Sequence, residues 1–266
     1  MPRPPDLADY TNPPLIEVAI SVQFDALPNY RQIWAGPLWE MFRERFPVTQ
    51  DQLPLQPVFE TFGALSPSIA FRLVDPLLSR MWFLNENRTE LLQFQSDRFG
   101  RNWQKLPPLN NSYPRFENII AEFSVDFLNL AEFCADKKIG QIAPSQCELT
   151  YVNFVSLADV QAAGTDGPFR FQHFGDDFKP DSMNALFTQN LSDAKGEQFG
   201  RVHVQATSAH RFDGVQGINM TITARGAPVE RSVPSSISRL SEFRTKIVQT
   251  FDSITSEVAH RAWGRK

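Results

Sequence analysis

One stretch of the chain interleaves cations with aromatic rings at a spacing that suits ligand binding. It covers residues 93–105, and in an extended strand Phe99, Arg101 and Trp103 share one face while Arg98 lies on the other. Aromatic rings stack on nucleic-acid bases, and neighbouring cations contact phosphates or the rings themselves. Nucleic-acid binding is therefore one hypothesis for this stretch.

A structural role explains the same residues without a ligand, because Asp97 can pair with a neighbouring arginine while Trp103 is buried. The chain carries a net charge of −4, which gives no general attraction to DNA or to an acidic membrane surface. Nucleic-acid binding through Arg98–Lys105 is thus the last of three function hypotheses, and no membrane partner is predicted.

Two further strand-like segments place polar side chains where a groove can form. Glu17 lies on the polar side of the first strand, and Tyr151 and Asn153 share a face of a strand in the second half. Glu17 is either a carboxylate facing the groove or the partner of an arginine or a backbone amide. Tyr151 is either a core aromatic with a satisfied hydroxyl or a ligand contact, and Asn153 can hydrogen-bond within the sheet. All three are binding candidates, beside Arg98, Arg101 and Trp103.

The last candidate is Trp263, in the basic segment that ends the chain. Trp and Arg are favoured anchors of protein interfaces. Trp263 either docks onto the body of its own chain or contacts a protein partner or a second subunit.

Catalytic and metal-binding motifs are absent from the sequence. It contains no GxSxG, P-loop, GxGxxG, HExxH or CxxC pattern. Two cysteines, Cys134 and Cys147, cannot form a disulfide framework, and Cys134 is expected to be a buried, inert thiol. We therefore predict no catalytic residue, no metal and no cofactor. This favours a protein that is not an enzyme, and an enzyme is kept as the alternative.

Composition indicates a folded chain with a large aromatic core. The chain has 266 residues, of which 42% are apolar and 21% charged, too apolar for a disordered protein. Its 23 Phe residues either fill the space between helices and sheet or line a ligand cavity. No run of apolar residues is long enough for a membrane helix, and the first residues lack a signal-peptide pattern, so a cytoplasmic location is expected.

Alternating hydrophobicity predicts a series of strands separated by turns. The strongest pattern is Leu15–Asp25, and a turn at residues 85–88 predicts a hairpin. The other predicted strands are Val58–Leu65, Ser68–Val74, Arg80–Asn85, Glu90–Asp97 with an extension through Phe99 and Trp103, Gln146–Leu157, Phe169–Phe174, Met183–Leu191, Arg201–Ser208 and Gly217–Arg225.

Helical spacing of apolar residues predicts two long helices and two short ones. One long helix runs from near Tyr113 to Lys138, and the other begins at a cap of Ser235-Ser236 and continues to Val258. A shorter helix up to Phe46 is capped by Asn29 and kinked or split by Pro37. A short turn or helix is expected near residues 157–162.

These elements favour an α+β fold in which curved antiparallel sheets are each covered by a long helix. Residues 1–14 form an extended arm, 15–140 a first half and 141–266 a second half, packed together as one compact body. In both halves the predicted order of elements is strand, helix, about four strands and long helix (β-α-β4-α). This order suggests internal duplication of a helix-grip-like unit. The alternative is one continuous mixed sheet with helices on one side.

Several short motifs along the chain carry a resemblance to a known family. Residues 10–18 contain Asn-Pro-Pro-Leu-Ile-Glu-Val, and further landmarks are Gln95–Phe99, Asn102-Trp103, Tyr113-Pro114-x-Phe116, Tyr151–Asn153 and Trp263–Arg265. The chain resembles a sporadically distributed family of uncharacterised prokaryotic proteins that open with Asn-Pro-Pro-(Ile/Leu)-x-Glu-Val. The resemblance implies a prokaryotic origin and an accessory or defence-type role, and it brings no established activity.

Three functions follow as hypotheses. The first is a non-catalytic interaction module that engages a protein partner, or a second copy, through a groove or helix face. The second is a small-ligand-binding protein or enzyme with a Phe-lined cavity between sheet and helix, where Glu17, Tyr151 and Arg98 are the polar groups. The third is nucleic-acid binding.

Overall fold

The first predicted strand lies at the centre of the structure. A computed structural model describes residues 4–62, 79–107, 109, 111–163, 167–171, 180–211 and 213–266. In it the alternating segment forms β1 (Leu15–Phe24). Val18, Ile20 and Val22 are fully buried on the face that carries Phe24, whose ring packs on Phe127 of a long helix. Alternation at period two therefore separates a helix-covered face from an opposite, polar face.

The described residues form one antiparallel sheet of nine strands in the order β2-β3-β4-β5-β1-β6-β9-β8-β7. β1 pairs with β5 on one side and with β6 on the other. The other strands are β2 (Val48–Gln52), β3 (Arg80–Leu84), β4 (Glu90–Gln95), β5 (Arg98–Gln104), β6 (Pro144–Ser156), β7 (Asn184–Ser192), β8 (Gln198–His210) and β9 (Gln216–Gly226).

The α+β class and the antiparallel sheet are confirmed, but the prediction of separate sheets is not. Pairing of β1 with β6 continues the sheet across both predicted halves. This is the layout of the alternative, a continuous sheet with helices on one side, except that its strand pairs are all antiparallel. Internal duplication stays a prediction.

Several predicted strands need correction. The segment predicted as Glu90–Asp97 with an extension is two strands, because Ser96-Asp97 form a two-residue turn between β4 and β5. β2 was not predicted, and residues 58–62 belong to no strand. Ser68–Val74, residues 63–65 and residues 172–174 lie outside the described residues.

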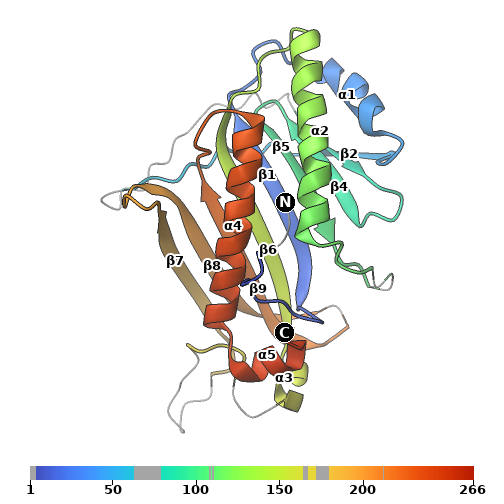
Figure 1. Ribbon diagram of the computed structural model, residues 1–266. Coiled ribbons are helices and arrows are strands. Elements are labelled where there is room, and N and C mark those ends of the chain that lie inside the picture. The colour runs from blue at the N-terminus through green and yellow to red at the C-terminus, as the bar shows by residue number, and fades with distance from the viewer. Residues whose placement is uncertain are drawn as a thin grey trace.

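Two long helices cover one face of the sheet and lie side by side (Figure 1). They are α2 (Phe116–Asp136) and α4 (Val233–Ile254). A 3-10 helix, η1 (Gln32–Trp34), leads into α1 (Ala35–Phe42), and α3 (Leu157–Ala163) and α5 (Glu257–Trp263) lie near the end of α4. No helix within the described ranges has the length and apolarity that crossing a membrane requires.

The helix ends differ from the predicted ones in three places. Ser232, rather than Ser235-Ser236, caps α4 by accepting a hydrogen bond from the Ser235 amide, and Val258 belongs to α5. Asn29 caps no helix start, because its side chain donates to the carbonyl of Lys138 at the end of α2. Pro37 stands in the first turn of α1, where its missing N–H costs no hydrogen bond.

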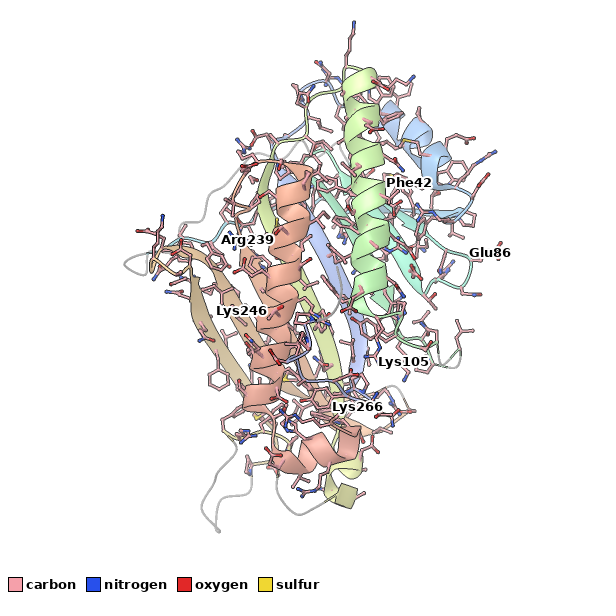
Figure 2. The ribbon with its side chains drawn as sticks, viewed as in Figure 1. Phe42, Glu86, Lys105, Arg239, Lys246 and Lys266 are labelled. Atoms are coloured by element: carbon pink, nitrogen blue, oxygen red, sulfur yellow. The ribbon has the colours of Figure 1, made fainter. Side chains whose placement is uncertain are left out.

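Phe residues fill the layer between helices and sheet, as the composition suggests. Phe99 of β5 stacks on Phe123 and Phe127 of α2 and on Phe42 of α1. Figure 2 shows Phe42 beside α2. Four rings from three elements thus tie α1 and α2 to the sheet, an arrangement whose aromatic contacts add to the burial of apolar area.

The two ends of the chain pair with each other. Tyr10 forms a bridge with Arg265, and the amide of Lys266 donates to the Asp9 carbonyl at 2.9 Å; Lys266 is labelled in Figure 2. The predicted arm is therefore held in place from Asp9 onward, beside the second half of α4, where Tyr10 also donates to Asp252 at 2.7 Å.

Candidate functional site

A partly enclosed pocket lies where α2 begins, between that helix, α4 and the sheet. Its cavity volume is about 70 Å³. Most of the lining is apolar, and the polar groups enter from different elements. The lining residues are Ala8, Asp9, Tyr10, Pro13, Leu15, Tyr113, Arg115, Phe116, Glu117, Tyr151, Asn153, Ile222, Arg244, Ile247, Val248 and Phe251.

Two tyrosine hydroxyls meet in the pocket. The hydroxyl oxygens of Tyr113 and Tyr151 are 3.2 Å apart, so one donates to the other. Burial raises the pKa of Tyr151 to about 12, and burial together with Tyr151 raises the pKa of Tyr113 well above its ordinary value. Both groups are therefore neutral phenols at neutral pH, and one of the two hydroxyl protons remains outside their mutual hydrogen bond.

A buried ion pair stands beside the tyrosines. The guanidinium of Arg244 on α4 donates to Glu117 on α2 at 2.7 Å, and the side chain of Arg244 is only 5% exposed. Phe116 lies under the same guanidinium at 5.9 Å from the ring centroid. This pair joins the two long helices at the wall of the pocket.

The mouth of the pocket is held by the N-terminal segment and by an unusual backbone conformation. Arg115, which precedes α2, has φ 74° and ψ 146°, a region that costs a non-glycine residue on the order of 1–3 kcal/mol. Its side chain pairs with Asp9 at 2.9 Å. The contacts around Arg115 therefore fix the turn that delivers Tyr113 to the pocket.

The charges at the pocket cancel in pairs. Arg244 opposes Glu117 and Arg115 opposes Asp9, while the two tyrosines are neutral. A charged ligand group would have to break one of these pairs or remain without a counter-ion, which is unfavourable in a mostly apolar site. The pocket is thus suited to an uncharged ligand with an apolar body.

Of the predicted binding candidates, Tyr151 and Asn153 line this pocket. Both lie on β6, and the side-chain amide of Asn153 donates to the Met220 carbonyl at 3.3 Å. Glu17 and Arg98 lie on the opposite face of the sheet. There Glu17 accepts from Asn102 at 2.7 Å, and Arg98 contacts Gln23 and the Gln56 carbonyl.

Arg101 and Trp103 are engaged within the protein, on the helix-covered face. The guanidinium of Arg101 is 3% exposed and pairs with Glu90, Glu122 and Asp126. Trp103 is buried and packs on Tyr113 with ring centroids 5.3 Å apart. Phe99, Arg101 and Trp103 do share a face, and that face carries packing and ion pairs.

Trp263 is buried as well. Its ring packs against Phe251 at 5.1 Å and Tyr10 at 6.1 Å between centroids, and the side chain is 5% exposed. Of the two interpretations of Trp263, docking onto its own chain describes its place in the fold. Tyr10 and Phe251 both line the pocket, so Trp263 packs against two of its lining residues.

Six polar residues of the pocket were not among the predicted candidates: Asp9, Tyr10, Tyr113, Arg115, Glu117 and Arg244. A signal for Arg244 was present, since it falls inside the apolar stripe of α4 between Leu240 and Ile247. A charged residue on the core face of a helix needs a buried partner. Nothing in the sequence alone indicates that this partner is Glu117, at a distance of 127 residues along the chain.

Thiols and metal ligands give no second site in the parts of the chain that the structure describes. No group of three or more His, Cys, Asp or Glu residues is placed there to bind a metal ion. Cys134 and Cys147 are buried, and burial raises the pKa of each thiol to about 12. As expected for Cys134, neither thiol is available as a thiolate at neutral pH.

Comparison with known proteins adds no relative: no family model, no curated protein and no solved structure matches the chain. The function has to be argued from the geometry of the pocket.

Proposed function

We propose that the protein binds a small, uncharged, amphipathic molecule in the pocket between α2, α4 and the sheet. The observation that carries this proposal is the meeting of the Tyr113 and Tyr151 hydroxyls in an apolar pocket whose charges are already paired. A few convergent polar groups in an apolar cavity are typical of ligand sites. This is the second of the three functions that the sequence suggests.

The ligand is expected to have an apolar body and one hydroxyl or carbonyl group. The apolar body would contact Ile222, Ile247 and Val248, and the polar group would exchange hydrogen bonds with the tyrosine pair. The predicted helix-grip-like arrangement, a long helix across a curved sheet, supports a cavity at this place. An accessory role in the cytoplasm of a prokaryote remains part of the proposal.

Phenol, toluene and benzoate test the proposal as matched probes. Phenol offers a ring and a hydroxyl, toluene lacks the hydroxyl and benzoate carries a charge. We expect phenol to cause saturable chemical-shift changes in the amide spectrum of the protein around Tyr151, toluene to bind more weakly and benzoate to bind weakest. Equal responses to all three probes, or none to phenol, would contradict the proposal.

Tyr151→Phe tests the hydroxyl pair. Loss of one hydrogen bond is worth about 0.5–1.5 kcal/mol, so we expect the affinity for phenol to fall about threefold to tenfold while that for toluene stays unchanged. Val248→Trp should fill the pocket and abolish binding of both. Val125→Trp is the matched control, because Val125 lies on α2 with 57% of its surface exposed, and it should leave both affinities unchanged.

A further inference from the structure

The polar face of the sheet, opposite α2 and α4, is crossed by an extended segment of the same chain. This crossing segment, residues 53–62, follows β2 and forms no helix or strand. It contacts side chains of β4, β5, β1, β9 and β8 in turn. Adjacent strands of a sheet lie about 4.8 Å apart, so the segment runs across the strands rather than along one of them.

Two glutamines hold the main chain of the crossing segment. Gln95 accepts from the amide of Leu55 at 2.8 Å and donates to its carbonyl at 2.9 Å. Gln23 does the same for Val58, at 2.9 Å and 3.1 Å. Each glutamine side chain binds both the N–H and the C=O of one residue, so it contacts the main chain and no side chain. Such a contact suits any extended chain with a free N–H at these positions.

The spacing of the two held residues fits one backbone conformation. Leu55 and Val58 are three residues apart, and each follows a proline, Pro54 and Pro57. A polyproline II helix has three residues per turn and leaves its main-chain groups without internal hydrogen bonds. Residues at this spacing therefore present their N–H and C=O groups to the same side, where Gln95 and Gln23 receive them.

At a third position the sheet contacts a side chain of the crossing segment. The carboxylate of Glu60 is 5% exposed and lies among Arg201, His203 and Arg225, at 3.1, 2.6 and 3.3 Å. Burial alone would raise the pKa of Glu60, but the hydrogen bond from His203 and the charges of the three partners outweigh it and lower the pKa. Arg201, His203 and Arg225 form a cationic cup on β8 and β9. Arg225 also pairs with Glu148 of β6, so the cup takes Glu60 as one further carboxylate.

We propose that this polar face is a binding site for extended, proline-containing acidic peptides, and that the crossing segment fills it in cis. The two glutamines would hold the main chain of such a peptide at positions three apart, each after a proline. The cationic cup would take a carboxylate two residues further on. Recognition of extended proline-rich chains by a preformed surface is a recurring mode of peptide binding.

Occupancy in cis sets the conditions for binding in trans. A tethered segment acts at an effective concentration on the order of millimolar, so a free peptide competes poorly with an intact crossing segment. Loosening the segment, without touching the glutamines or the cup, raises the fraction of open sites and hence the apparent affinity. The protein partner foreseen from the sequence would then supply the competing chain.

The test uses a fluorescent peptide with the sequence of residues 53–62, titrated with the full chain and followed by anisotropy. Glu60→Gln weakens the hold on the crossing segment but leaves the receptor intact, so we expect it to bind the peptide at least tenfold more tightly than the unmodified chain. Glu86→Gln is the control, because Glu86 is exposed in the β3–β4 turn, as Figure 2 shows, and it should behave as the unmodified chain.

Two further measurements keep the test decisive. Replacement of both Pro54 and Pro57 by Gly loosens the crossing segment by a second route and should raise peptide affinity as Glu60→Gln does. A peptide with Gln at the position of Glu60 should bind about tenfold more weakly to either variant and lose its dependence on salt. If neither loosened variant binds the peptide, or if the peptide with Gln binds equally well, the proposal is wrong.

Discussion

Arg101→Met should lower the free energy of unfolding by about 3 kcal/mol, because it leaves the buried carboxylate of Asp126 short of a partner. Arg101 pairs with Asp126, which is 1% exposed, and with Glu90 and Glu122. Removal of one member of a buried ion pair typically costs about 3–5 kcal/mol. Arg45 still pairs with Asp126, which places the expected effect at the lower end.

Urea denaturation of the variant and the unmodified chain measures this difference. Arg211→Met is the matched control, since Arg211 and Asp213 are each 41% exposed and pair at 2.7 Å. An exposed pair of this kind is worth about 1 kcal/mol or less. If Arg101→Met lowered the free energy of unfolding no more than Arg211→Met does, a buried structural network around Arg101 would be contradicted. Arg101 would then again be a candidate ligand contact, as the sequence suggested.

The strand and helix pattern was predictable where one face of an element is buried. β1 alternates cleanly because its helix-covered face carries Val18, Ile20 and Val22, and α4 shows a continuous apolar stripe for the same reason. β2 was missed because its residues are half-buried and exposed in turn and none is strongly apolar except Val48. The turn at Ser96-Asp97 was missed because it lacks the Asn-Gly or Gly signals of a tight hairpin.

The candidate site was only partly predictable, because it is made by pairs that are distant in sequence. Tyr151 and Asn153 were identified from their shared face on one strand. Arg244 and Glu117 meet only after α2 and α4 pack side by side. Hydrophobic periodicity tells which face of a helix is buried, but it does not tell which two buried faces meet.

The crossing segment illustrates the same limit on the other face of the sheet. Residues 58–62 looked like the start of a strand because Val58 and Phe59 favour extended structure. Their partners, however, are the side chains of Gln23 and the cationic cup rather than a neighbouring strand. Residue types that favour extended structure occur in strands and in a segment bound by side chains, so these residue types do not separate the two.

Above pH 9 the free energy of unfolding should fall steeply because of the two buried thiols. Burial raises the pKa of Cys134 and Cys147 from 9.0 to about 12. The unfolded chain therefore releases these protons above pH 9 while the folded chain keeps them. The folded state binds more protons, so stability decreases as pH rises, by up to about 1.4 kcal/mol per pH unit for each thiol, and levels off near pH 12.

The buried tyrosines provide the internal comparison for this prediction. Burial raises the pKa of Tyr30 and Tyr151 from 10.0 to about 12, so their contribution begins one pH unit higher than that of the thiols. Urea denaturation of a Cys134→Ala, Cys147→Ala double variant should show a flat stability between pH 8.5 and 9.5, where the unmodified chain already declines, and the same decline above pH 10. An unchanged slope in the double variant below pH 10 would mean that the thiols are not the buried neutral groups described, and that the packing of α2 and β6 around them is looser than the structure shows.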